Sequence, residues 1–259
     1  RLARRSIGLV LSGGGARAMA HIGVLDELAA AGIVVDRFGG CSFGGFIAAL
    51  AASGMAPDEI DAHCYEEWVR RRPLGDYRLP RRSLIAGERV HAMLQRTVPG
   101  RAEGLPLDFY CVASDLRSSE LVVQRRGPLP EMIAAGMALP GLTPPVELGG
   151  RLLVDGAVLN NLPVGPMADA DEGPVIVVDA SARLTVEDAD AGIVELMTRS
   201  AMLGSADQVA EARGRADLLI EPDNEDGVGL LEFHQLDAMR LAGRRAALRA
   251  LSGLERPLL

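Results

Sequence analysis

Ser42 lies at the centre of Gly40-Cys41-Ser42-Phe43-Gly44, a segment that fits the pattern G-x-S-x-G. In hydrolases this pattern marks a sharp strand-to-helix turn that carries a nucleophilic serine. Glycines at both flanks allow a strained backbone that projects the hydroxyl outward, and the amides that open the next helix face the charge that develops in the reaction. We therefore expect Ser42 to be a nucleophile. The same five residues in a glycine-rich chain also suit an ordinary turn.

A second glycine cluster, the run from Gly13 to Arg17, follows the first predicted strand and opens a helix. Consecutive amides in such a loop can bind an anion, so the segment predicts an oxyanion hole. With Ala18 the spacing also fits a dinucleotide fingerprint, and Asp36 ends the next predicted strand where a ribose-binding acid belongs. Ser42 favours the hydrolase, because a dinucleotide site needs no nucleophile. A dinucleotide-binding enzyme is the less favoured alternative.

Asp155 ends the apolar run Leu152-Leu153-Val154 and precedes Gly156. In an open α/β sheet such strand ends line the ligand crevice. Burial there raises the pKa of a carboxylate and makes it a better base. Asp155 is thus a candidate to take the serine proton without a histidine, although an aspartate before a glycine also suits a turn cap.

Histidine supplies the alternative base. A Ser-Asp-His triad in the chain order of the α/β hydrolases needs a histidine after the acid, and only His234 follows Asp155. His234 begins a helix-like segment without a supporting motif, so we expect it to be a surface or capping residue. His21, on the first predicted helix, is expected to pack inside.

The candidate residues occur on a βαβα pattern, which predicts an α/β fold with a mostly parallel sheet. Runs bounded by Gly, Pro or Asp predict the strands Ile7–Leu11, Ile33–Phe38, Leu107–Ala113, Ser119–Gln124, Arg151–Val154 and Pro174–Ala180, and an edge strand Leu218–Ile220. Helical spacing predicts Arg17–Ala31, Phe43–Ser53, Pro57–Arg72 and Leu236–Leu251. A turn is expected over Gly39–Gly45 and an irregular surface loop over Arg70–Arg82.

Composition narrows the class of protein. With 259 residues and 48% hydrophobic content, we expect residues 1–259 to be a single domain with a sizeable core. A net charge of −8 argues against nucleic acid as a partner. Cys41, Cys64 and Cys111 have neither disulfide-framework nor zinc-site spacing, which fits a cytoplasmic location and no metal. Neither a membrane-spanning run nor a signal peptide is predicted.

The segment Leu236–Leu251 carries four arginines, Arg240, Arg244, Arg245 and Arg249, beside an apolar stripe. This pattern suits a helix that lies on an anionic bilayer. It also suits a helix that packs on the core with a solvated basic face, which we favour. Peripheral membrane contact is the alternative.

Three elements taken together resemble the patatin-like phospholipases. They are Gly13-Gly14-Gly15-Ala16-Arg17, Gly40-Cys41-Ser42-Phe43-Gly44 and Asp155-Gly156-Ala157, in that order. The likeness extends to Ala20-His21-Ile22-Gly23-Val24-Leu25, to Ala138-Leu139-Pro140-Gly141 with Pro144-Pro145, and to Asn160-Asn161-Leu162-Pro163. Within the family the chain most resembles the neuropathy target esterase branch and its bacterial relatives. Arg1-Leu2-Ala3-Arg4 resembles the junction that follows cyclic-nucleotide-binding domains there, so we expect an excised catalytic domain.

The resemblance implies a three-layer α/β/α fold and a serine lipid acyl hydrolase. The substrate would be a phospholipid or lysophospholipid, cleaved through an acyl-enzyme by a Ser42–Asp155 dyad without metal or cofactor. The implied oxyanion-hole amides are those of Gly13, Gly14, Gly15 and Ala16. Arg17 would steady that loop or the lipid phosphate, and Gly40, Gly44 and Gly156 would support the site.

Two positions depart from the family pattern: Ala18, usually glycine, and Gly136, usually serine. The Ala18 methyl is expected to crowd a helix–strand contact, and Gly136 lacks a hydroxyl that would order its loop. Neither change removes a catalytic group. The departures leave a second interpretation open, a lipid-binding regulatory domain with a vestigial site.

Overall fold

The computed structural model describes residues 6–79, 81–181, 192–224 and 227–254. Within these residues a sheet of eight strands forms the middle layer, in the order β5-β6-β3-β2-β1-β7-β8 with β4 also paired to β3. The strands are β1 Gly8–Leu11, β2 Arg37–Cys41, β3 Asp108–Asp115, β4 Leu121–Gln124, β5 Val146–Leu148, β6 Arg151–Asp155, β7 Val175–Val178 and β8 Leu218–Ile220. The run from β3 through β2, β1 and β7 to β8 is parallel, whereas β4, β5 and β6 pair antiparallel. The predicted mostly parallel sheet is confirmed.

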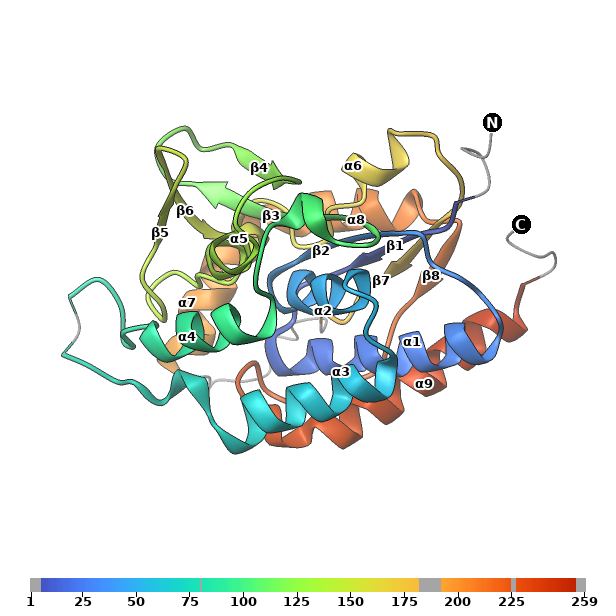
Figure 1. Cartoon of the computed structure of the whole chain (residues 1–259), viewed down its shortest axis with the longest axis horizontal. Coiled ribbons are helices and arrows are strands. Elements are labelled where there is room, and N and C mark those ends of the chain that lie inside the picture. The colour runs from blue at the N-terminus through green and yellow to red at the C-terminus, as the bar shows by residue number, and fades with distance from the viewer. Residues whose placement is uncertain (1–5, 80, 182–191, 225–226, 255–259) are drawn as a thin grey trace.

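Helices cover both faces of the sheet (Figure 1). They are α1 Ala20–Ala30, α2 Ser42–Ala52, α3 Pro57–Cys64, α4 Glu88–Thr97, α5 Leu129–Gly136, α6 Gly165–Ala168, α7 Ile193–Met202, α8 Ala206–Gly214 and α9 Leu236–Ser252. Shorter helical turns include η2 Gly15–Met19, η3 Tyr65–Arg70 and η8 Phe233–Gln235. In Figure 1, α1, α3 and α9 lie on one side of the sheet and α6 and α8 on the other. This is the expected three-layer architecture.

The alternation of side chains along β1 explains the two outer layers. Leu9 and Leu11 join the core cluster that includes residues of α1, α2 and α9. Val10, between them, joins a second cluster that includes Met167 of α6 and Ala212 of α8. Successive strand residues point to opposite faces, so a continuous apolar run requires cover on both sides.

The second strand begins four residues later than predicted, at Arg37 instead of Ile33. Gly39 and Gly40 therefore belong to β2, and the predicted turn over Gly39–Gly45 is wrong because α2 starts at Ser42. The glycines are needed for packing: a Cβ at Gly39 would overlap the ring of Tyr110 on β3. Propensity disfavours glycine in strands, but this contact with a neighbouring side chain outweighs it.

The C-terminal helix α9 packs along α1, as the favoured interpretation predicted. Most of its apolar residues are buried, and a Cβ at Gly243 would overlap the carbonyl of Ala20, so the two helices approach closely. Arg240 pairs with Asp26 at 2.7 Å and with Asp61 at 3.1 Å. Most of the apolar residues proposed for insertion into a bilayer are thus covered by the protein itself, whereas Leu241 and Leu248 are 52% and 53% exposed. No helix of the described ranges combines the length and apolar character needed to cross a membrane.

Candidate active site

Ser42 occupies a strained turn between β2 and α2. Cys41 is extended, with φ −121° and ψ 143°, whereas Ser42 has φ +50°, in the left-handed region that non-glycine residues rarely adopt. Such strain persists only where the surroundings enforce it, and it clusters at functional sites. The Ser42 side chain does not project into solvent as the motif predicted, because the residue is only 9% exposed.

The glycines that flank Ser42 allow backbone segments to cross at close range. A Cβ at Gly44 would overlap the carbonyl oxygen of Ser12, the residue that follows β1. A Cβ at Gly40 would lie 2.7 Å from the carbonyl carbon of Gly44. The pattern G-x-S-x-G therefore has a steric basis here: any side chain at either glycine would displace the turn that orients Ser42.

The structure brings Ser42 and Asp155 together. The Oγ of Ser42 donates to Oδ2 of Asp155 at 2.6 Å, and the backbone N–H of Ala157 donates to Oδ1 at 2.9 Å. The thiol of Cys41 lies 3.7 Å from the same Oδ1. Asp155 is fully buried, and desolvation raises its pKa to about 6 although these hydrogen bonds lower it. A carboxylate in this state is a stronger base than an exposed one and still ionises near neutral pH.

The strand that carries Asp155 runs in the direction opposite to that of its neighbour β3. The prediction placed Asp155 at the end of an apolar strand in a mostly parallel sheet, and that strand, β6, runs antiparallel to β3. The strand enters from beyond the carboxyl edge of the parallel strands and ends where Asp155 pairs with Ala113. Cys41 pairs with Val112, so the next residue, Ser42, lies level with Ala113 on the other side of β3.

The four amides of the glycine-rich loop are not equivalent. The N–H of Gly13 donates to the carbonyl of Asn161 at 3.2 Å, and that of Ala16 donates to the carbonyl of Leu230 at 2.8 Å. Within the described residues, the amides of Gly14 and Gly15 have no such acceptor. Gly14 and Gly15 are thus the members of the predicted set that can still donate to an incoming oxyanion.

Two residues to which the sequence assigned no part in the site hold this loop in place. Nε2 of His21, on α1, lies 2.9 Å from the carbonyl oxygen of Ser12. Burial lowers the pKa of His21 to about 4, so the ring is neutral and this nitrogen is a donor. Asn161 accepts the Gly13 N–H, and its side chain lies near Ser42: a Cβ at Gly13 would overlap Oδ1 of Asn161 and approach Cβ of Ser42 to 3.1 Å. From the sequence, the segments that contain His21 and Asn161 were singled out only as part of the likeness to the family, and neither residue was assigned a part in the site.

Arg17 follows the loop in η2 and is half-buried. Desolvation lowers the pKa of its guanidinium, and the charge of Glu195 on α7 opposes that shift. The Nε atom of Arg17 is buried without a hydrogen-bond partner among the residues described.

His234 does not take part in the site. It is exposed in η8, where its Nε2 lies 3.4 Å from Nε2 of Gln235. No hydrogen bond joins a described histidine side chain to Ser42 or Asp155. The arrangement favours a two-residue site over the triad.

The two departures from the family pattern leave the site intact. Ala18 is fully buried in the main core cluster. A Cβ at Gly136 would lie 2.9 Å from the carbonyl oxygen of Val112, so glycine allows α5 to approach β3. Neither residue is among the hydrogen-bond partners of Ser42 or Asp155.

The position of Asp36 argues against the alternative of a dinucleotide-binding site. Asp36 precedes β2 instead of ending it, and its Oδ2 accepts the N–H of Ile7 at 2.8 Å. Because β1 and β2 are parallel with Gly8 opposite Arg37, Asp36 lies at the amino edge of the sheet. The glycine-rich loop lies at the carboxyl edge, a full strand length away, so the two cannot hold one ribose and its phosphate.

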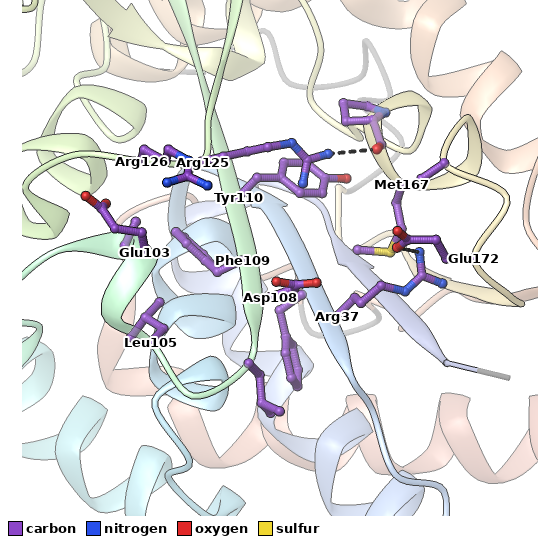
Figure 2. Close-up of a pocket in the computed structure, with 15 residues that line it drawn as sticks. Arg37, Glu103, Leu105, Asp108, Phe109, Tyr110, Arg125, Arg126, Met167 and Glu172 are labelled. Carbon is purple, nitrogen blue, oxygen red and sulfur yellow. Dashed lines mark hydrogen bonds and ion pairs between the residues drawn. The ribbon is translucent and has the colours of Figure 1, made fainter. Parts of the chain in front are cut away.

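That amino edge contains a separate cavity of about 360 Å³, shown in Figure 2. Arg37 and Asp108, the first residues of β2 and β3, line it, and the guanidinium of Arg125 lies 4.9 Å from the ring centre of Tyr110. Since Arg37 is the first residue of β2 and Ser42 follows its last residue, this cavity is not part of the candidate active site.

Comparison with known proteins agrees with this geometry. Residues 9–168 match the family described as patatin-like phospholipase. An uncharacterized NTE family protein of Mycobacterium tuberculosis is 38% identical over 97% of this chain and 47% of its own length, so the chain spans about half of that relative. Lysophospholipase NTE1 of Cryptococcus neoformans is 33% identical over 69% of this chain and 11% of its own length. The crystal structure of VipD from Legionella pneumophila has the same fold, with a TM-score of 0.56 and 14% identity over 95% of this chain and 67% of its own.

Proposed function

The chain belongs to the patatin-like phospholipase family, with the NTE branch and its bacterial relatives, and we propose that it hydrolyses the carboxylic ester of a phospholipid or lysophospholipid. The observation that carries the proposal is the 2.6 Å hydrogen bond from Ser42 to the buried carboxylate of Asp155. A serine is a weak nucleophile unless a base removes its proton, and Asp155 is the base in contact with it.

In the first half of the reaction, Asp155 takes the proton of Ser42 as Oγ bonds to the ester carbonyl carbon. The carbonyl oxygen becomes an oxyanion, for which the amides of Gly14 and Gly15 are the available donors. The C–O bond to the alcohol then breaks, and Asp155 returns the proton to the leaving oxygen. The product is an acyl group esterified to Ser42.

Water completes the cycle. Asp155 removes a proton from a water molecule that attacks the acyl carbon, and the proton then passes to Oγ as the fatty acid leaves. Ser42 is the first residue of α2, so the positive end of that helix lies beside both oxyanions. Arg17 follows the loop and is half-buried, and its guanidinium is proposed either to steady the loop or to bind the lipid phosphate.

A fluorophosphonate probe tests the nucleophile directly. We expect covalent labelling at Ser42, identified by mass spectrometry, and no labelling of Ser42→Ala. A panel of lysophospholipid, phospholipid and monoacylglycerol then identifies the substrate class. Labelling at another serine, or full hydrolysis by Ser42→Ala, would refute the proposed site.

A further inference from the structure

The loop between η3 and α4 combines exposed apolar side chains with a high density of positive charge, and it projects from the left end of the molecule in Figure 1. Tyr77 is 77% exposed and Leu79 is 82% exposed, the latter the most exposed large hydrophobic side chain among the residues described. Five exposed arginines share the segment: Arg71, Arg72, Arg78, Arg81 and Arg82. The whole chain has a net charge of −8, so this is a local reversal of sign.

The described residues of this loop are largely irregular, as predicted, but they are tied together at one end by backbone contacts. The N–H of Arg78 donates to the carbonyl of Leu84 at 3.1 Å, and Tyr77 and Ile85 form an antiparallel bridge. Ser83 is buried and its hydroxyl donates to the carbonyl of Ile85 at 2.7 Å. We call the described residues between Asp76 and Ala86 the arginine hairpin. Backbone hydrogen bonds connect its two sides at the base, and its outer side chains are exposed.

One side of the arginine hairpin is attached to the segment that supports Asp155. The amides of Leu84 and Ile85 donate to the carbonyls of Gly141 and Leu142 at 2.9 and 3.0 Å. Three residues before Gly141, the carbonyl of Ala138 accepts the N–H of Asp155 at 2.9 Å. The hairpin is therefore positioned by the same short segment that positions the proposed base.

The other side leads to the neighbour of the proposed nucleophile. Tyr77 lines an apolar cavity of about 500 Å³ together with Trp68 and Phe233. The rings of Trp68 and Phe233 pack on Phe43, the residue after Ser42, with centroids 4.9 and 5.3 Å away. The hairpin thus has an apolar connection to the turn that carries Ser42.

We propose that the arginine hairpin docks the chain on an anionic lipid bilayer, so that the site at Ser42 faces its substrate. Leu79 and Tyr77 enter the headgroup boundary, while Arg81 and Arg82 contact lipid phosphates. No salt bridge to a described acidic residue occupies Arg72, Arg81 or Arg82, so their charge is available to an anionic surface. Basic residues near such a surface and interfacial aromatic and aliphatic side chains act together in peripheral binding.

This proposal rests on the proposed function, because docking on a bilayer serves an enzyme whose substrate is a membrane lipid. Its test does not depend on catalysis. Vesicle co-sedimentation of the chain measures binding to phosphatidylcholine alone and to phosphatidylcholine mixed with phosphatidylglycerol. We expect binding to the anionic vesicles at low salt. Binding should weaken several-fold at 0.5 M salt, because the Debye length falls from about 10 Å at 0.1 M to about 3 Å at 1 M and the charges are screened. Ser42→Ala should bind as the wild type does.

Matched variants locate the docking surface. Leu79→Ser should reduce binding about tenfold, and Arg81→Gln with Arg82→Gln should remove most of the salt dependence. The controls are Val34→Ser, 73% exposed at the amino edge of the sheet, and Arg126→Gln, exposed beside the cavity of Figure 2. Both should bind as the wild type does. Arg244→Gln with Arg245→Gln tests α9, and we expect no loss because most of its apolar residues are buried against the protein.

A second readout separates the two proposals. Hydrolysis of a water-soluble short-chain ester should be unchanged in the hairpin variants, while hydrolysis of vesicle lipid falls with binding. If the wild type binds vesicles through the hairpin but hydrolyses neither substrate, the proposed function fails and the docking surface stands. Vesicle binding that is indifferent to the hairpin variants, or that falls equally in the controls, would overturn the docking proposal, as would preferential binding to a polyanion such as heparin.

Discussion

The hydroxyl of Ser42 and the carboxylate of Asp155 are joined by a 2.6 Å hydrogen bond between residues 113 positions apart. The bond links the first residue of α2 to the last residue of β6. The register of the sheet accounts for this contact, since both residues lie level with Ala113 on either side of β3. Ser42 is the donor and Asp155 the acceptor, so the proton that must move is already directed at the atom that receives it.

Hydrolysis should rise with pH through an apparent pKa of about 6. Asp155 must be ionised to accept the proton, and desolvation raises its pKa to about 6. The pH dependence of kcat/KM for a soluble ester between pH 4.5 and 8.5 measures this. His21, with its pKa lowered to about 4, titrates below that range. A rate that stays level down to pH 4.5 would exclude Asp155 as the base.

Asp155→Asn should lose on the order of 10³-fold or more in kcat, because the amide keeps the shape but cannot take a proton. The folded pKa of Asp155 lies above its unfolded value, so ionisation costs native stability as pH rises from about 4 to about 6. Asp155→Asn should lack this decline. The free energy of unfolding of the variant, compared with that of the wild type, should therefore be higher at pH 7 than at pH 4 by up to about 2 kcal/mol. Chemical denaturation at both pH values measures this difference.

His234→Ala is the control for activity and should stay within a few-fold of the wild type. An inactive His234→Ala together with an active Asp155→Asn would show that the site is a triad with His234 as the base.

Gly13→Ala should reduce kcat strongly while the protein remains folded. The added methyl would overlap Oδ1 of Asn161 and approach Cβ of Ser42, so the loop must shift away from the turn. A misplacement of about 1 Å at a reacting group can cost on the order of 10²-fold in rate. Gly104→Ala, where a Cβ meets nothing within 4 Å, is the control and should keep full activity. Equal rates in the two variants would show that this loop plays no part in the reaction.

Arg37→Met should destabilise the fold without affecting the reaction. The Arg37 side chain is 7% exposed, and its guanidinium binds Glu172 at 3.3 Å and the carbonyl of Ser6 at 3.0 Å, at the edge of the sheet shown in Figure 2. Loss of these partners should cost about 2 kcal/mol, less than a fully buried pair because Glu172 is half exposed. Urea unfolding measures the difference. The exposed Arg126→Met should change the free energy of unfolding by less than about 0.5 kcal/mol, and a similar loss in both variants would mean that burial of Arg37 is not the cause.

Much of the fold follows from local patterns. Strands β1, β3, β7 and β8 lie within one or two residues of their predicted bounds, because apolar runs there are limited by Gly, Pro or Asp. The second strand was misplaced because Ile33 and Val35 are apolar but precede it, while glycines form its centre. The three-residue strand β5 and the helices α4 to α8 were not predicted. For α4 the local signal was present, because its buried residues Val90, Met93, Leu94 and Thr97 follow helical spacing.

Local sequence patterns also identified part of the candidate site. Motif spacing singled out Ser42 and Asp155, and the structure brings them together, although Asp155 arrives on an antiparallel strand. The availability of Gly14 and Gly15 instead depends on carbonyls of Asn161 and Leu230, which bind the neighbouring amides from far along the chain. No local pattern specifies those contacts.

The tight link between β5 and β6 has a practical consequence. Leu148 pairs with Arg151, so Gly149 and Gly150 alone form the turn, both with positive φ and with open space around them. A chain break at such a tip is well tolerated when the flanking strands still pair. Division there would leave Ser42 on one fragment and Asp155 on the other, neither competent alone. Ester hydrolysis would then report reassembly of the two fragments, which makes this hairpin a natural place to build a complementation sensor.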